Sequence, residues 1–171
     1  MKHFAPGVIA LLLISSCNMA VKPGKEEALS YNDKMITILN PYFDAEEKFQ
    51  AALDNDESDI NAAFSEFKNE TDKITAAVNA VPAFDSEDAL KKAMLEYLGT
   101  IRKTADNEYA KLVGIRTNPD YTDTESEHFT DLADEFSIVR DNAQEELEEA
   151  GKKFDSRQDA FAASYHFTIE R

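Results

Sequence analysis

Residues 60–81 read INAAFSEFKNETDKITAAVNAV, and their core-forming side chains recur at steps of four and three positions. The series consists of Ile60, Phe64, Phe67, Thr71, Ile74, Val78 and Val81. Because an α-helix completes a turn about every 3.6 residues, such steps place these side chains on one face. The stretch therefore predicts an amphipathic helix that packs this face against a core.

Two later segments repeat this rhythm. One contains Leu90, Met94, Tyr97, Leu98, Ile101, Ala105, Tyr109 and Leu112. The other contains Phe129, Leu132, Phe136, Val139, Ala143, Leu147, Ala150 and Phe154, with Phe161 and Tyr165 in phase beyond it. Capping boxes at Thr122/Glu125 and Thr124/Glu127 predict where this last segment begins. We expect it to form one helix of about 44 residues that continues through Gly151 instead of breaking there.

The segment before residue 54 is less regular. Leu29, Asn32, Ile36, Leu39, Phe43 and Leu53 lie roughly on one face. Pro41 interrupts the segment, and the run Asn40–Asp44 could start a new helix. The pattern nevertheless continues in phase across the proline, which favours one kinked helix over two short ones.

Polar turns around residues 54–59, 82–86 and 114–123 separate these segments, and no stretch has the pattern of a β-strand. Short links between amphipathic helices favour antiparallel neighbours. The sequence therefore predicts an all-α fold over residues 26–171. We expect an antiparallel up-down-up-down four-helix bundle with a long C-terminal helix, and we place its aromatic side chains in the core.

The first residues have a different character. A basic start, Met1–His3, precedes the apolar run Val8–Ile14 and the small residues Ser15 and Ser16. The segment Leu13-Ile-Ser-Ser-Cys17 resembles the lipobox of bacterial lipoproteins. The resemblance implies that residues 1–16 are a signal peptide, that a diacylglycerol is attached to Cys17, and that the new amino terminus is acylated. Three acyl chains would anchor the protein far more firmly than one.

Other interpretations of this leader are possible. The apolar run is far shorter than the roughly 20 residues of a transmembrane helix. An ordinary secretion signal would leave Cys17 as an unpaired thiol in an exported protein, which is unusual. We read residues 17–25 as the lipidated cysteine and a tether. In some bacteria an aspartate directly after the lipidated cysteine retains a lipoprotein in the inner membrane. Position 18 is asparagine instead, which favours the outer over the inner membrane of the bacterial cell envelope.

The composition excludes several classes of function. The net charge is −16, and removal of Lys2 with the leader makes it one unit more negative. Nucleic-acid binding requires clustered Lys and Arg, so we expect no nucleic-acid partner. Cys17 is the only cysteine, so the chain forms no internal disulfide.

No catalytic or metal-binding motif is complete. Glu125-x-x-His128 supplies one of the two Glu-x-x-His steps that a di-iron bundle needs. The run from Asp54 starts like a calcium loop but has Asp59 where glycine is required. Ser65-x-x-Lys68 lacks the companion motifs of a penicillin-binding site. We therefore predict no enzyme activity, no metal site and no cofactor.

Surfaces remain as the candidate functional features. The connection around residues 115–121 carries Arg116, Asn118 and Tyr121, residue types that are frequent in recognition. The first hypothesis is a membrane-anchored, non-catalytic module that binds or scaffolds a protein partner of unknown identity, through helix faces or this loop. The alternative is a periplasmic helical bundle that binds a small ligand or metal, as a carrier or chaperone.

Overall fold

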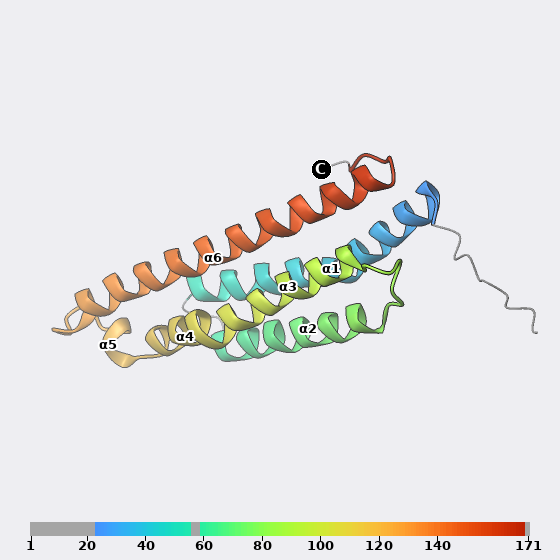
Figure 1. Ribbon diagram of the computed structural model, residues 1–171. Coiled ribbons are helices and arrows are strands. Elements are labelled where there is room, and N and C mark those ends of the chain that lie inside the picture. Colours follow the sequence, from blue (N-terminus) through green and yellow to red (C-terminus); the bar gives the residue numbers. More distant parts are fainter. Residues whose placement is uncertain (1–22, 56–58, 170–171) are drawn as a thin grey trace, which may run out of the picture.

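The structure, a computed structural model, describes residues 23–55 and 59–169, and these residues form helices and connections with no β-strand. They contain five helices, the third of which is divided into three consecutive segments. The bounds are α1 Lys25–Asp54, α2 Ile60–Ala80, α3 Ala89–Thr104, η1 Ala105–Tyr109, α4 Ala110–Arg116, α5 Pro119–Thr122 and α6 Phe129–Ser164. The prediction of an all-α fold with a long C-terminal helix is confirmed, because α6 has 36 residues. Figure 1 shows the long helices lying alongside one another in an elongated body.

The long helices are packed unequally. α1 packs along α2, α3 packs along α6, and contacts between α2 and α3 join the two pairs. An aromatic cluster fills the centre, where the rings of Phe49 and Phe67 stack at 5.6 Å and Tyr109 lies 5.7 Å from Phe67. By contrast, α1 and α6 have few direct contacts. This leaves a seam between the first and the last long helix.

α1 runs without a break through Pro41, which confirms one helix in place of two. In Figure 1 its blue beginning is inclined to the cyan part that follows, as expected where a proline removes an N–H group from the helix interior. The face predicted to be buried was partly wrong, because Leu29 and Phe43 are 38% and 49% exposed. The buried face consists of Ala28, Asn32, Met35, Leu39, Tyr42, Ala45, Phe49, Ala52 and Leu53. Alanines occupy part of this face, and a pattern based on large apolar side chains overlooks them.

Aspartates organise the beginnings of the two middle helices α2 and α3. Asp59 caps α2, because its Oδ1 accepts a hydrogen bond from the N–H of Ala62 at 3.0 Å. Asp88 precedes α3 in the left-handed region, with φ 50°. Asp85 Oδ1 accepts a hydrogen bond from the Asp88 N–H at 2.7 Å, which holds this turn in place.

The third helix differs from its prediction in one respect. The sequence predicts a regular α-helix, but residues Ala105–Tyr109 form a π-helical segment. Within it the N–H of Ala110 donates to the carbonyl of Ala105, five residues earlier. The face that was expected to be buried is nevertheless buried, since Ala105, Tyr109 and Leu112 are at most 3% exposed. Such π segments are rare overall, and those that occur are often found at functional sites.

α6 continues through Gly151, as predicted, but it begins later than expected. Neither capping box forms, because α6 starts at Phe129 and His128 makes no side-chain cap hydrogen bond. Thr122 instead ends the short helix α5, and its hydroxyl donates to the carbonyl of Pro119 at 2.9 Å. Asn118 and Pro119 together start this extra turn, which uses residues that the sequence assigned to the long helix and its loop.

The chain turns back after α6. His166 has φ 60°, a left-handed conformation, and the ring of Phe167 then packs 6.0 Å from that of Phe161.

At the N-terminal end, the predicted signal peptide, Cys17 and most of the tether lie outside the described residues. None of the helices described here combines the length and the apolar character that crossing a membrane requires.

Candidate functional site

An exposed apolar row follows one side of α1. Leu29, Ile36 and Phe43 recur every seven residues beside the buried face. Leu29 and Phe43 are two of the large hydrophobic side chains that the described residues leave exposed, and Ile36 is half-buried. A seven-residue spacing keeps side chains close to one line along a helix. α1 therefore has more apolar surface than the core covers.

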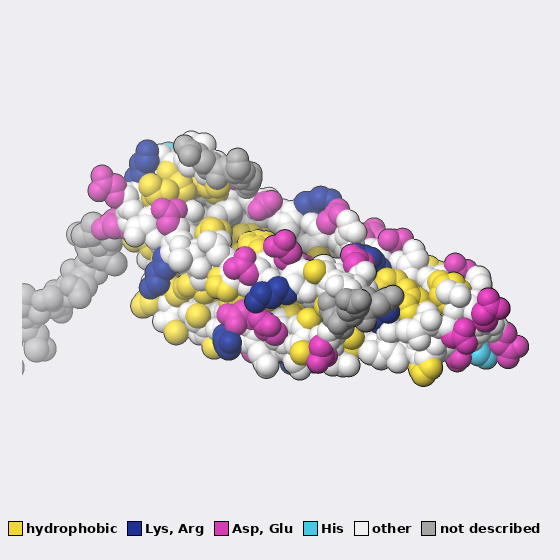
Figure 2. Space-filling model, turned by 180° about the vertical axis from the view of Figure 1, so that it is seen from behind, with side chains coloured by type: hydrophobic (Ala, Val, Ile, Leu, Met, Phe, Trp, Pro, Cys, Tyr) yellow, Lys and Arg dark blue, Asp and Glu magenta, His cyan; other side chains and the backbone are white. Residues whose placement is uncertain are grey.

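This row forms one wall of a groove of about 840 Å³ along the seam between α1 and α6. Phe154, Asp155 and Gln158 of α6 line the opposite wall, and Phe167–Ile169 close one side. Figure 2 shows the body from behind Figure 1, with hydrophobic side chains reaching the surface in patches among acidic ones. A cavity of this size is within the range of ligand sites, and its open shape also suits an elongated partner such as a helix.

Two buried carboxamides line the same groove. Gln158 Nε2 donates to Asn32 Oδ1 at 2.8 Å, and the two residues are 4% and 5% exposed. Because buried polar groups are costly unless they are paired, this bond stabilises the approach of α1 to α6. The charged residues that line the groove are Asp33 and Asp155, with no lysine or arginine among its described lining residues.

A more polar pocket of about 440 Å³ lies further along the same seam. It shares Tyr97 and Gly151 with the apolar groove, so the two are neighbours. Glu46 and Glu148 are its acidic lining residues, and Arg140 is its basic one. The hydroxyls of Tyr42 and Tyr109 lie close to the Glu46 carboxylate. Burial raises the pKa of Glu46, and the neighbouring hydroxyls of Tyr42 and Tyr109 act in the opposite direction.

The tyrosines around Glu46 are fixed by the surrounding helices. Gln50 Nε2 donates to the Tyr109 hydroxyl at 3.0 Å, and Tyr109 itself belongs to the π segment. Burial, followed by the nearby charge of Glu46, raises the pKa of Tyr97 to about 12 and also raises those of Tyr42 and Tyr109. The three hydroxyls consequently stay protonated near neutral pH and can donate hydrogen bonds.

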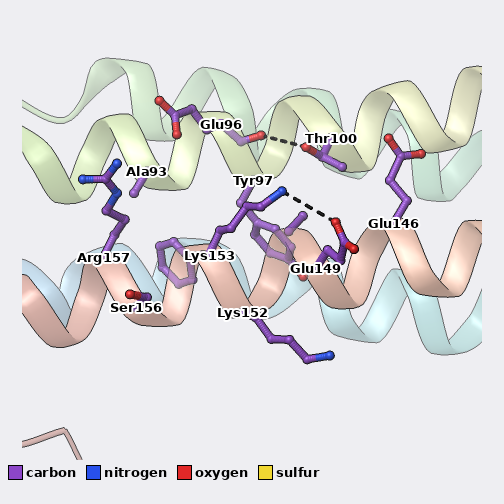
Figure 3. Close-up of a pocket in the computed structure, with 12 residues that line it drawn as sticks. Ala93, Glu96, Tyr97, Thr100, Glu146, Glu149, Lys152, Lys153, Ser156 and Arg157 are labelled. Atoms are coloured by element: carbon purple, nitrogen blue, oxygen red, sulfur yellow. Dashed lines mark hydrogen bonds and ion pairs between the residues drawn. The ribbon is translucent and has the colours of Figure 1, made fainter.

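A second groove, of about 930 Å³, runs between α3 and α6. Its lining carries both signs of charge, and Figure 3 shows Lys153 extending to Glu149, a contact of 3.7 Å. The stacked rings of Tyr97 and Phe154, 5.7 Å apart, line both grooves. Because acids and bases of this second groove pair with each other, it offers less for recognition than the seam.

The predicted loop residues are held by contacts within the chain. Arg116 is the last residue of α4, and its Nε donates to the carbonyl of Leu53 at 3.1 Å. Its guanidinium lies 5.8 Å from the ring of Tyr121, which in turn stacks on Phe136 at 5.5 Å. Asn118 Oδ1 accepts from the N–H of Asp120 at 3.0 Å. These side chains form one cluster that joins the α4–α5 turn to α1 and α6, and partner binding by them stays a prediction.

Comparisons with known proteins leave the family open. No protein-family model matches the chain, and neither curated proteins nor solved structures give a match. Among residues 23–55 and 59–169, no group of three or more His, Cys, Asp and Glu side chains could hold a metal ion. Glu125 and His128 are both exposed, on the turn before α6. The seam between α1 and α6 therefore remains as the candidate functional site.

Sequence reasoning missed both parts of this site. The spacing of Leu29, Ile36 and Phe43 was visible, but these positions were assigned to the core. Tyr42 and Glu46 are four residues apart and thus neighbours on one helix face, which is a detectable signal. The contribution of Tyr109 could not be found in this way, because it depends on a π segment, and no proline or glycine within that segment signals it in the sequence.

Proposed function

We propose that this protein is a lipid-anchored, non-catalytic module of the bacterial cell envelope that binds a protein partner through the groove between α1 and α6. The observation that carries the proposal is the exposed row of Leu29, Ile36 and Phe43 along that groove. Exposed apolar surface of this kind is typical of interaction sites. The seven-residue spacing fits a partner that lies along α1, because helices contact one another at such intervals.

We also propose that the long helices form an antiparallel four-helix bundle, with α5 as an addition. The short connections at residues 81–88 and 55–59 support this arrangement. The alternating course of the coloured helices in Figure 1 supports it as well. In such a bundle α1 and α6 are neighbours, and the seam between them leaves one side of the bundle open.

A small-ligand carrier is the second candidate function. The volumes of the two adjoining seam cavities, about 840 and 440 Å³, favour it. The polar groups that converge at Glu46 would orient such a ligand. We prefer a protein partner because the groove is open along its length and its apolar row spans two heptads.

The anchor is proposed on the lipobox alone. Lys25 is eight positions beyond Cys17, and a chain of that length spans at most about 28 Å. The groove would thus operate close to a membrane surface, with the outer membrane preferred. Radiolabelled palmitate should enter the protein in a bacterial host but not its Cys17→Ser variant, and equal labelling of the two would refute lipidation.

Site-specific photocrosslinking tests the binding surface. A photoreactive phenylalanine at Thr37, an exposed residue of the groove lining, should give one adduct of discrete mass in intact cells. The same group at Ile138, which is 60% exposed outside both seam cavities, is the control and should give none. The adduct should disappear when Leu29 and Phe43 are both replaced by Asp. An adduct that persists in that variant, or that also forms from position 138, contradicts the proposal.

A further inference from the structure

We propose that the seam receives an amphipathic helix that places one basic side chain, lysine or arginine, in the pocket of Glu46. This inference rests on the proposed function, and it names the chemistry of the partner. Its basis is the juxtaposition of an apolar row, an acidic lining and the half-buried carboxylate of Glu46 along a single face.

The apolar row sets the shape of the partner. Leu29 and Phe43 are 14 positions apart on a continuous helix, which corresponds to about 21 Å at 1.5 Å per residue. Three anchors at heptad spacing match the contacts that a second helix makes along α1. An extended strand would instead require open backbone groups, and those of α1 are used within the helix.

The charges decide between possible helices. Asp33 and Asp155 line the groove, and its described lining contains no lysine or arginine. A second copy of this chain would bring another net charge of −16 to an already acidic surface, which disfavours self-association. A helix with basic residues beside its apolar stripe is complementary in both respects.

The Glu46 pocket supplies a specific position for one cation. Glu46 lies three residues beyond Phe43, so it is about one turn further along the same helix. Tyrosine hydroxyls lie close to its carboxylate, but no ion pair of Glu46 is found in the described part of the chain. Arg140 also lines this pocket, but its guanidinium is paired with Asp54 through contacts of 2.7 and 3.1 Å. A partially buried carboxylate without a cation is a suitable acceptor for a charge-assisted hydrogen bond.

The test uses a phage-displayed library of helical peptides with apolar residues at heptad positions and all other positions randomised. The target is the full chain purified from a bacterial host. Selected peptides should carry lysine or arginine about one turn beyond the last apolar anchor. The best peptide is then compared with a copy in which norleucine replaces that basic residue, and the loss of affinity should be about tenfold or more.

Variants of the protein assign this preference to Glu46. Glu46→Gln should bind the basic and the norleucine peptides equally. Glu47→Gln, a matched loss of charge at the exposed neighbouring residue, should keep the preference. Circular dichroism of each variant verifies that the helices are intact.

The possible failures are distinguishable. Peptides that depend on Leu29 and Phe43 but show no preference for a basic residue would overturn this inference and leave the proposed function standing. A preference that survives in Glu46→Gln would overturn it too. If the library yields no peptide, the helical partner is refuted, and crosslinking from position 37 separately decides whether the groove binds a protein at all.

Discussion

Replacing Gln158 by Leu should destabilise the protein, because it removes the donor to the buried carboxamide oxygen of Asn32. Both residues are at most 5% exposed, so water cannot easily replace the bond of 2.8 Å. An orphaned buried acceptor costs about 1–3 kcal/mol. We therefore expect the free energy of unfolding to fall by about 2 kcal/mol, which corresponds to about 4–8 °C in Tm for a chain of this size.

The double variant Asn32→Leu/Gln158→Leu makes the test specific. When both partners become apolar, no polar group is left without a partner, and the cost should be within about 1 kcal/mol of zero. The two single changes together would then overestimate the loss by about 2 kcal/mol or more, which is a clear coupling energy. Urea unfolding of the wild type, both single variants and the double variant measures this quantity.

Gln144→Leu is a suitable control, since Gln144 is an exposed glutamine of the same helix. Its effect on the free energy of unfolding should stay within about 0.5 kcal/mol. Additive losses in the double variant, or a Gln158→Leu protein as stable as the wild type, would refute the idea that this pair joins α1 to α6.

Three further changes have defined outcomes. Burial raises the folded pKa of Glu46 above its ordinary 4.5, so its ionisation disfavours folding as pH rises; Glu46→Gln should be more stable than wild type at pH 7, with the difference vanishing below about pH 4.5 in urea unfolding. Phe67→Ala empties a fully buried position behind Tyr42 and Tyr109, and calorimetry should give a loss of about 3–5 kcal/mol. Pro41→Ala restores a helical N–H group in exposed surroundings and should raise the unfolding free energy by about 1–3 kcal/mol; an unchanged denaturation midpoint would contradict this.

Periodicity predicted most of the fold correctly. In α2 the series from Ile60 to Val81 is buried apart from Phe64, which is half-buried. Apart from Thr71, every fourth or third residue there is large and apolar, so the face is unambiguous. In α1 the buried face includes alanines while Leu29 and Phe43 lie outside it, so size and hydrophobicity alone gave the wrong phase.

The beginning of α6 and the π segment illustrate a different limit. Thr122 and Thr124 had suitable partners for capping, but the Asn118–Pro119 pair starts a separate short helix first. Local signals of this kind compete, and packing of Tyr121 on Phe136 favours one outcome. The seam itself could not be predicted, because it depends on how closely two helices far apart in sequence approach each other.

The unequal packing of the long helices has a mechanical consequence. α1 with α2, and α3 with α6, form two halves whose main connection is the contact between α2 and α3. Moving α6 outward from α1 would break the Asn32–Gln158 hydrogen bond but leave the aromatic centre packed, whereas parting α1 from α2 would disrupt that centre. Openings that expose little buried surface require little free energy and occur often in folded proteins. Separation on this flank would therefore cost less free energy than separation of α1 from α2, and the rest of the fold would stay packed.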